Sequence, residues 1–256
     1  MISVDLNCDM GESFGPWNMG RDAELMDYVS SVNIACGFHA GDPKTMRETV
    51  ETAIAKGVAI GAHPAYPDLQ GFGRRNMSLS PQEVFDAVLY QIAALKGICG
   101  AFGTTLRHVK PHGALYNQAA KDERLASSIA EAIRKIGDDL IVFGLSGSFL
   151  ISEAEKLGLR TASEAFADRT YQHDGSLTPR TVAGALIINA GRAAKQVLQM
   201  VADQSVETID GGTIPVKADT ICIHGDGEHA LEFARAIRTT LTENGVLISV
   251  PYADPR

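Results

Sequence analysis

The sequence predicts a single-domain α/β protein built as a parallel β/α barrel. Strand-like runs alternate with amphipathic helical stretches along the whole 256-residue chain, and this alternation is typical of repeated βαβ units. At least five of the runs end on ionisable side chains, and if the strands are parallel these ends meet at one mouth. The seven runs are residues 4–9, 33–39, 59–63, 108–112, 140–146, 162–168 and 220–226.

The two faces of each run differ, and this difference favours a barrel over an open sheet. In the first run, apolar residues alternate with Asp5, Asn7 and Asp9, so one face is apolar and the other is polar. An open sheet with helices on both sides is apolar on both faces. The polar face suits the interior of a barrel whose upper end is open to water. We therefore expect seven or eight strands.

The helices between the runs have recognisable starts and ends. Asp42 and Pro43 form an N-cap and first turn before residues 44–56, and Gly57 ends that helix. The sequence 80–83 is a capping box before the helix 84–98. Further helices are expected at 22–30, 122–136, 149–157, 181–202 and 228–244, an inserted hairpin at 206–217, and a last strand or strand-like tail at 245–251.

Composition narrows the classes of partner. A hydrophobic fraction of 45% and a charged fraction of 21% are ordinary for one folded domain spanning residues 1–256. A net charge of −8 without a basic run argues against nucleic acid. The N-terminus lacks the pattern of a secretory signal, and no uninterrupted apolar stretch is long enough to cross a membrane. We expect a cytoplasmic protein with a small-molecule substrate and four reduced core cysteines.

The first strand end gathers oxygen-bearing side chains. Asp5, Asn7 and Asp9 share a face, and Glu12 follows them. Carboxylates in this arrangement bind divalent metals or act as general bases. The alternative is that acidic residues here only cap the helix after the loop.

Histidines and a lysine end the next strands. His39 and His63 lie at equivalent ends, where with Asp9 they form a candidate metal site, or act in proton transfer without metal. Lys110 shares a face with His112. A buried lysine needs an anionic partner, which is either Asp9 or a substrate oxygen, unless this strand is misassigned and the lysine is at the surface.

Loops contribute further candidates. His224 and Asp226 lie in a glycine-containing turn before a helix, where an anion is favoured. Arg74, Arg169 and Arg180 are candidates for binding a substrate carboxylate, or are solvated surface residues.

The chain has neither a dinucleotide fingerprint nor a phosphate loop, and the glycine spacing around Ser146 does not form a nucleophile elbow. A nucleotide would bind by another route or on another chain.

Long stretches of the sequence resemble the LamB/YcsF family. The resemblance lies in residues 5–12, 33–42, 61–68, 71–75, 109–117, 164–171 and 221–226, in order along nearly the whole chain. It implies a seven-stranded β/α barrel like that of glycoside hydrolases and polysaccharide deacetylases. It further implies hydrolytic opening of 5-oxo-L-proline to L-glutamate with ATP, expected with Mg, by a three-component 5-oxoprolinase that includes partner subunits B and C.

These observations give a working hypothesis for the site. ATP would phosphorylate the lactam oxygen, water activated by a carboxylate or histidine would open the ring, and Lys110 or His112 would stabilise negative charge. The alternatives are a metal-dependent amidase or deacetylase acting alone, and a non-catalytic substrate-binding subunit. The oligomeric state stays open, a homo-oligomer included. The predicted catalytic residues are Asp5, Asp9, Lys110 and His112; the substrate-binding residues are Asn7, Glu12, Arg74, Arg169, Arg180, His224 and Asp226; the metal ligands are Asp9, His39 and His63.

Overall fold

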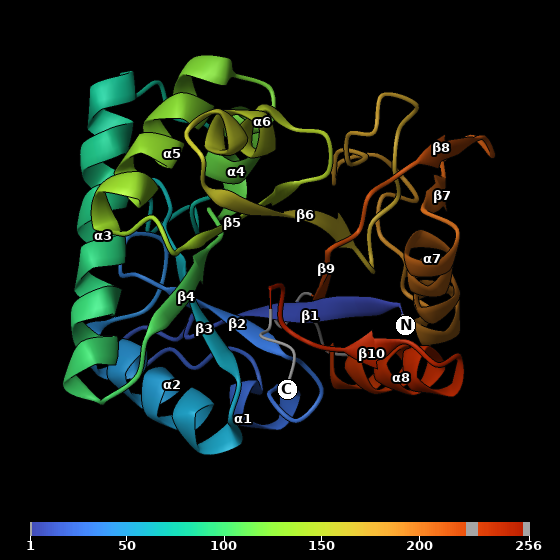
Figure 1. Cartoon of the computed structure of the whole chain (residues 1–256), viewed down its shortest axis with the longest axis horizontal. Coiled ribbons are helices and arrows are strands. Elements are labelled where there is room, and N and C mark those ends of the chain that lie inside the picture. Colours follow the sequence, from blue (N-terminus) through green and yellow to red (C-terminus); the bar gives the residue numbers. More distant parts are fainter. Residues whose placement is uncertain (1, 224–229, 253–256) are drawn as a thin grey trace.

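A computed structural model shows a closed barrel of parallel strands surrounded by helices (Figure 1), and it describes residues 2–223 and 230–252. Pairing runs in order around the ring, and β1 closes it by pairing with β9. The predicted seven-stranded β/α barrel is therefore confirmed. The barrel strands are β1 (Ser3–Met10), β2 (Ser31–Ala35), β3 (Ala59–His63), β4 (Leu106–Val109), β5 (Ile141–Leu145), β6 (Arg160–Phe166) and β9 (Thr220–Ile223).

Helices cover the outside of the barrel (Figure 1). Asp42 caps α2 by accepting a hydrogen bond from the Thr45 amide, and Gly57 ends the helix with a φ of 67°. Ser80 and Glu83 form the predicted capping box of α3. The helices are α1 (Asp22–Leu25), α2 (Pro43–Lys56), α3 (Pro81–Ala101), α4 (Gly113–Ala119), α5 (Glu123–Ile136), α6 (Phe149–Lys156), α7 (Ala190–Ala202) and α8 (Ala230–Glu243).

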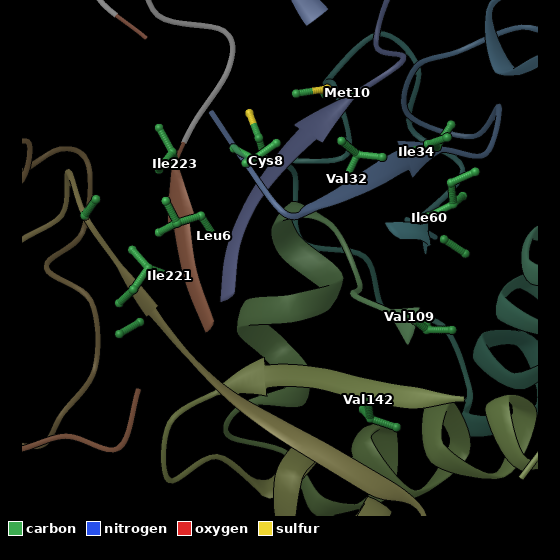
Figure 2. Packing of buried hydrophobic residues seen from close by; sticks show 14 of the residues in the cluster. Leu6, Cys8, Met10, Val32, Ile34, Ile60, Val109, Val142, Ile221 and Ile223 are labelled. Carbon is green, nitrogen blue, oxygen red and sulfur yellow. The ribbon is translucent and has the colours of Figure 1, made fainter. Parts of the chain in front are cut away.

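The apolar parity of the strands forms the main core between barrel and helices. Leu6 of β1, Ile34 of β2 and Ile221 of β9 are fully buried in one hydrophobic cluster (Figure 2). The alternate residues of the same strands point into the barrel, where Asp5, Asn7 and other polar side chains are also fully buried. The alternation in the sequence thus predicts correctly which side chains reach the interior of the barrel.

Two additions accompany the ring. β10 (Leu247–Ile248) pairs with Ser3 and Val4 at the start of β1, ahead of the residues that pair with β9. An antiparallel hairpin, β7 (Ser205–Glu207) and β8 (Thr213–Pro215), lies where the inserted hairpin is expected.

Several boundaries differ from the sequence prediction. β2 ends at Ala35, and the chain turns at Gly37, which has a φ of 92°, so the strand does not reach residue 39. The helix predicted for residues 181–202 begins only at Ala190, because Asn189 accepts a hydrogen bond from the Arg192 amide and caps it there. The helix predicted for 22–30 ends at Leu25. The short α4, which follows Pro111, is absent from the prediction.

The cysteines and the longest helix fit the core. All four cysteines are buried free thiols, as expected. By length and composition α3 could cross a membrane, but it lies against the barrel and buries Val88, Ile92 and Leu95 in the core. Core helices of globular proteins commonly pass the same test, so this one helix is weak evidence for a membrane span.

Candidate active site at the mouth of the barrel

A cavity of about 470 Å³ opens at the carboxyl ends of the strands. This volume is in the range of small-molecule sites. The prediction that the charged strand ends converge on one mouth therefore matches the structure for most of the candidates. The predicted residues that line the cavity are Asp9, Glu12, His63, Arg74, Lys110, His112, Arg169 and Arg180.

Asp5 lies below the cavity, near the other end of the barrel. Its carboxylate accepts hydrogen bonds from the hydroxyls of Ser30, Ser31 and Thr220, at 2.6, 2.7 and 2.5 Å. Burial raises the pKa of Asp5 to about 6, although these hydroxyls lower it. The geometry supports a structural role for Asp5 in place of the catalytic role expected from the sequence.

Asn7 occupies the next layer up and joins several elements. Its amide nitrogen donates to Glu164 Oε1 at 3.0 Å and to Thr220 Oγ1 at 2.7 Å. Its carbonyl oxygen accepts from Asn33 Nδ2 at 2.7 Å and from Lys110 Nζ at 3.1 Å. All of its hydrogen-bonding groups face protein, so Asn7 orients neighbouring residues and does not itself reach the cavity.

Lys110 carries a buried positive charge at the site. Its ammonium lies 3.0 Å from Asp9 Oδ1 and 2.8 Å from Glu164 Oε1, and it also contacts Cys222 Sγ at 3.1 Å. Burial alone would lower the pKa of Lys110, but Asp9, Cys222 and Glu164 raise it well above its usual value. Lys110 is thus charged and held between two carboxylates, as the expected pairing with Asp9 requires.

Glu164 is the main site residue that was not predicted from the sequence. It is fully buried on β6, and besides Lys110 it accepts a hydrogen bond of 2.6 Å from the Tyr116 hydroxyl, at Oε2. Tyr116, on α4, lines the cavity. The signal was available, because Glu164 has the inward parity of its run, two residues after Ala162 and two before Phe166.

Three histidines lie together on the other side of Asp9. The His39 and His112 rings stack in parallel with centroids 3.8 Å apart, and the His63 ring meets the His112 ring edge-on. His63 Nε2 lies 3.3 Å from Asp9 Oδ2, and His39 Nε2 lies 3.3 Å from Glu12 Oε1. Burial lowers the pKa of His112 to about 3 and that of His39 well below its usual value.

The loop that covers these histidines needs glycine at position 73. Gly73 has a φ of 61°, and a Cβ there would lie 2.8 Å from both the His112 ring and His39 Cβ. The histidines are therefore packed tightly under the loop that follows β3. This packing fixes their rings relative to one another.

One group of side chains is spaced like metal ligands. A donor atom from each of Glu12, His39, His63 and His112 lies within 4.8 Å of the others. The metal set expected from the sequence contained Asp9 with His39 and His63. In the structure Asp9 pairs with Lys110, and Glu12 and His112 take its place in the cluster. The donor set of imidazole nitrogens and a carboxylate fits a divalent transition metal.

Arginines line the outer part of the cavity. Arg169 is buried and donates from Nη2 to the Thr178 carbonyl at 2.6 Å, while its Nε has no hydrogen-bond partner among the described residues. Arg74 lies over the Phe72 ring, 4.9 Å from its centroid, and Arg180 also faces the cavity. These cations could bind a carboxylate.

Two further candidates from the sequence, His224 and Asp226, lie outside the described residues.

Comparison with known proteins places this chain in a family. A protein from Tolumonas auensis, named as the A component of 5-oxoprolinase, is 58% identical over 248 residues, which cover 97% of this chain and 99% of that protein. The crystal structure of a lactam utilization protein from Thermus thermophilus superposes with a TM-score of 0.93 and 48% identity, covering 98% of this chain and 100% of that one.

A more distant neighbour shares the fold alone. A polysaccharide deacetylase from Bacillus cereus has a TM-score of 0.50 at 14% identity, covering 100% of this chain and 95% of the deacetylase. The model of the LamB/YcsF family matches residues 4–254, nearly the whole chain. The resemblance seen in the sequence is confirmed, and the chain belongs to the LamB/YcsF family.

Proposed function

We propose that this chain is the A component of a 5-oxoprolinase, which opens 5-oxo-L-proline to L-glutamate with hydrolysis of ATP. The observation that carries the proposal is Lys110, a buried cation held by Asp9 and Glu164 at the wall of a cavity that arginines also line. The names of close relatives support the same reaction. A reaction that consumes ATP also fits the cytoplasmic location expected from the sequence.

Arg169 is the best-placed group for the substrate carboxylate. Its Nε is buried and has no hydrogen-bond partner within the described part of the chain, and such a donor gains a full hydrogen bond when an anion arrives. Arg180 lines the same cavity and adds a second positive charge. A carboxylate bound by these arginines leaves the lactam ring inside the cavity that Lys110 also lines.

The chemistry of a lactam explains the need for ATP. The ring amide is stabilised by resonance, so water attacks it slowly, and transfer of a phosphoryl group to its oxygen makes the carbon a better electrophile. Water then adds to that carbon, and the C–N bond breaks as the nitrogen takes a proton. Hydrolysis of the resulting acyl phosphate gives L-glutamate and phosphate.

Two residues at the mouth would act in this sequence. Asp9 would take the proton from the attacking water, as a carboxylate general base. Lys110 would stabilise negative charge on the oxygen that develops it. His112 is less suited to the second role, because both of its ring nitrogens already face protein atoms at 2.9 and 2.8 Å.

Partner subunits B and C would supply the nucleotide chemistry. The chain carries no phosphate loop in its sequence, so the ATP site, with its Mg, would lie largely on these partners. The lactam would then be opened in the barrel of this chain.

The test is turnover by the reconstituted three-subunit system. Asp9→Asn and Lys110→Ala are each expected to reduce glutamate formation by at least about 100-fold, as expected for loss of a general base or of a charge that stabilises the transition state. Lys195→Ala, in a basic residue of α7, is the matched control and should keep full activity. Near-normal turnover in both site variants, with ADP formed at the normal rate, would reject the assignments.

A metal-dependent amidase acting alone is the second candidate. The spacing of Glu12, His39, His63 and His112 favours it. It predicts that the purified chain, supplied with zinc but without ATP or partners, hydrolyses simple amides or lactams. Strict dependence on ATP and on both partners excludes it.

A further inference from the structure

Nε2 of His63 and Nδ1 of His112 face each other at a short distance, which is unfavourable when both imidazoles are neutral and neither nitrogen carries a hydrogen. His63 Nδ1 lies 2.7 Å from the Lys110 carbonyl, and His112 Nε2 lies 2.8 Å from the Phe72 carbonyl. A carbonyl oxygen only accepts, so these contacts assign the ring hydrogen of each histidine to that nitrogen. His63 Nε2 and His112 Nδ1 then both present lone pairs, at a distance of 2.9 Å. The two lone pairs repel each other unless a positively charged species lies between the two nitrogens.

Carboxylates surround these two nitrogens. Glu12 Oε1 lies 3.7 Å from His112 Nδ1, and Asp9 Oδ2 lies 3.3 Å from His63 Nε2. Negative charge on both sides favours a cation between the rings. Tetrahedral zinc with bonds of about 2.0–2.1 Å separates its ligand atoms by roughly 3.3 Å. The N–N distance of 2.9 Å between His63 and His112 and the N–O distance of 3.7 Å between His112 and Glu12 each differ from this separation by about 0.4 Å.

The backbone carbonyls behind the rings have the positions expected of outer-shell partners. A metal-bound histidine almost always donates its other N–H to a carbonyl or carboxylate, which fixes its tautomer and orientation. His63 and His112 both do so. His39 does not, because its Nδ1 is buried without a partner among the described residues, and it is absent from the described lining of the cavity, which includes the other three.

We propose that His63 Nε2, His112 Nδ1 and Glu12 Oε1 form a site for one divalent transition metal, with zinc as the best fit to two imidazoles and a carboxylate. All three residues line the cavity, so a fourth ligand would come from that side. His39 is a positioning residue, which donates its Nε2 hydrogen to Glu12 Oε1. When bound, such a metal acts as a Lewis acid toward a substrate oxygen.

This site differs from the Asp9, His39 and His63 set expected from the sequence. Asp9 Oδ1 is hydrogen-bonded by Lys110 and Asn33, so its position is fixed by the neighbouring charge cluster. The metal proposal does not depend on the ring-opening reaction. It is tested on the isolated chain, without ATP, lactam or partners, so it can fail while the proposed function holds.

The first experiment uses the unmodified full-length chain, free of any tag, stripped with a chelator and dialysed. Titration with zinc should give one bound equivalent by elemental analysis. A zinc concentration about 100-fold above Kd should raise the Tm by about 5–10 °C. Cobalt should bind with visible absorption bands typical of a four-coordinate site. Substoichiometric binding with no change in Tm would overturn the proposal, and would leave a shared proton as the species between the rings.

The second experiment locates the metal by substitution. His112→Gln and Glu12→Gln should each weaken zinc binding by more than about 100-fold, while His39→Gln should weaken it by about 10-fold, as for an outer-shell partner. His173→Gln is the matched control, because His173 is exposed and paired with Asp210. Circular dichroism confirms that each variant is folded. Zinc binding of wild-type affinity in folded His112→Gln and Glu12→Gln would place the metal elsewhere and refute the site.

Discussion

Replacing Lys110 by methionine tests whether the buried charge cluster of Lys110, Asp9 and Glu164 stabilises the folded protein through coupled interactions. The ammonium lies 2.8 Å from Glu164 Oε1 and 3.0 Å from Asp9 Oδ1, and its side chain is only 3% exposed. Methionine keeps most of the aliphatic volume but removes the cation. The Asp9 and Glu164 carboxylates would then lack the cation that both contact.

The expected loss follows from this burial. Removing one partner of a buried ion pair costs about 3–5 kcal/mol of unfolding free energy, because the other charge stays desolvated. For a chain of this size, that corresponds to a fall in Tm of roughly 6–20 °C. Glu164→Gln alone should also destabilise, since it leaves Lys110 with one carboxylate fewer and perturbs the hydrogen bond from Tyr116.

The double variant measures the interaction between Lys110 and Glu164 separately from their other contacts. Lys110→Met with Glu164→Gln should be less destabilised than the sum of the single variants by about 2 kcal/mol, since Glu164 is no longer a carboxylate that lacks its cation. Asp9 lacks its cation both in Lys110→Met and in the double variant, so its loss cancels in the comparison. Urea unfolding of the four proteins gives this coupling energy. The exposed Lys156, paired with Glu123 and Glu153, provides the control: Lys156→Met should leave the urea midpoint nearly unchanged, because water screens this ion pair. Additive single effects, or a Lys110→Met cost as small as that of the control, would refute the reasoning.

Three further predictions concern buried contacts inside the barrel and at its mouth. The pKa of Asp5 is raised from 3.8 to about 6 in the folded state, so the folded state binds more protons, and the contribution of Asp5 to the unfolding free energy falls by about 2 kcal/mol as pH rises from 4 to 6. Asp5→Asn should remove this contribution from urea midpoints measured across that range. Gly61→Ala should cost about 1–3 kcal/mol or more in the same assay, because the added Cβ overlaps the His108 ring; a neutral effect would mean that His108 can move. Tyr116→Phe should lower stability by about 1.5–3 kcal/mol through loss of the 2.6 Å hydrogen bond to Glu164, and an unchanged Tm would contradict that contact.

The interior of the barrel could be predicted from the sequence because it depends on strand parity. Asp5, Asn7 and Asp9 alternate with apolar residues, and the structure places them at three successive levels, from the floor to the cavity. The period of two along a strand is a local property of the chain. It therefore holds whatever the lengths of the loops.

The arrangement of the histidines could not be predicted in this way. His39 and His112 lie beyond the ends of β2 and β4, so strand parity says nothing about where their rings point. Their contact depends on the turn at Gly37 and on the loop at Gly73, which brings the Phe72 carbonyl onto His112. These are contacts between segments far apart in the sequence, and one sequence without its fold does not specify them.

The buried polar layers explain why the mouth can be rigid although loops supply part of it. A chain of hydrogen bonds runs from Lys110 through Asn7 and Thr220 to Asp5, so groups on β1, β9 and the segment after β4 hold one another in place. Each member is buried, and the loss of a hydrogen bond at such a site costs about 1–3 kcal/mol when a buried polar group is left unsatisfied. Because Lys110 also binds Asp9 and its carbonyl binds His63, the same network orients both the charge cluster and the histidines. A substitution at the floor of the barrel should therefore alter the geometry of the site without touching the cavity.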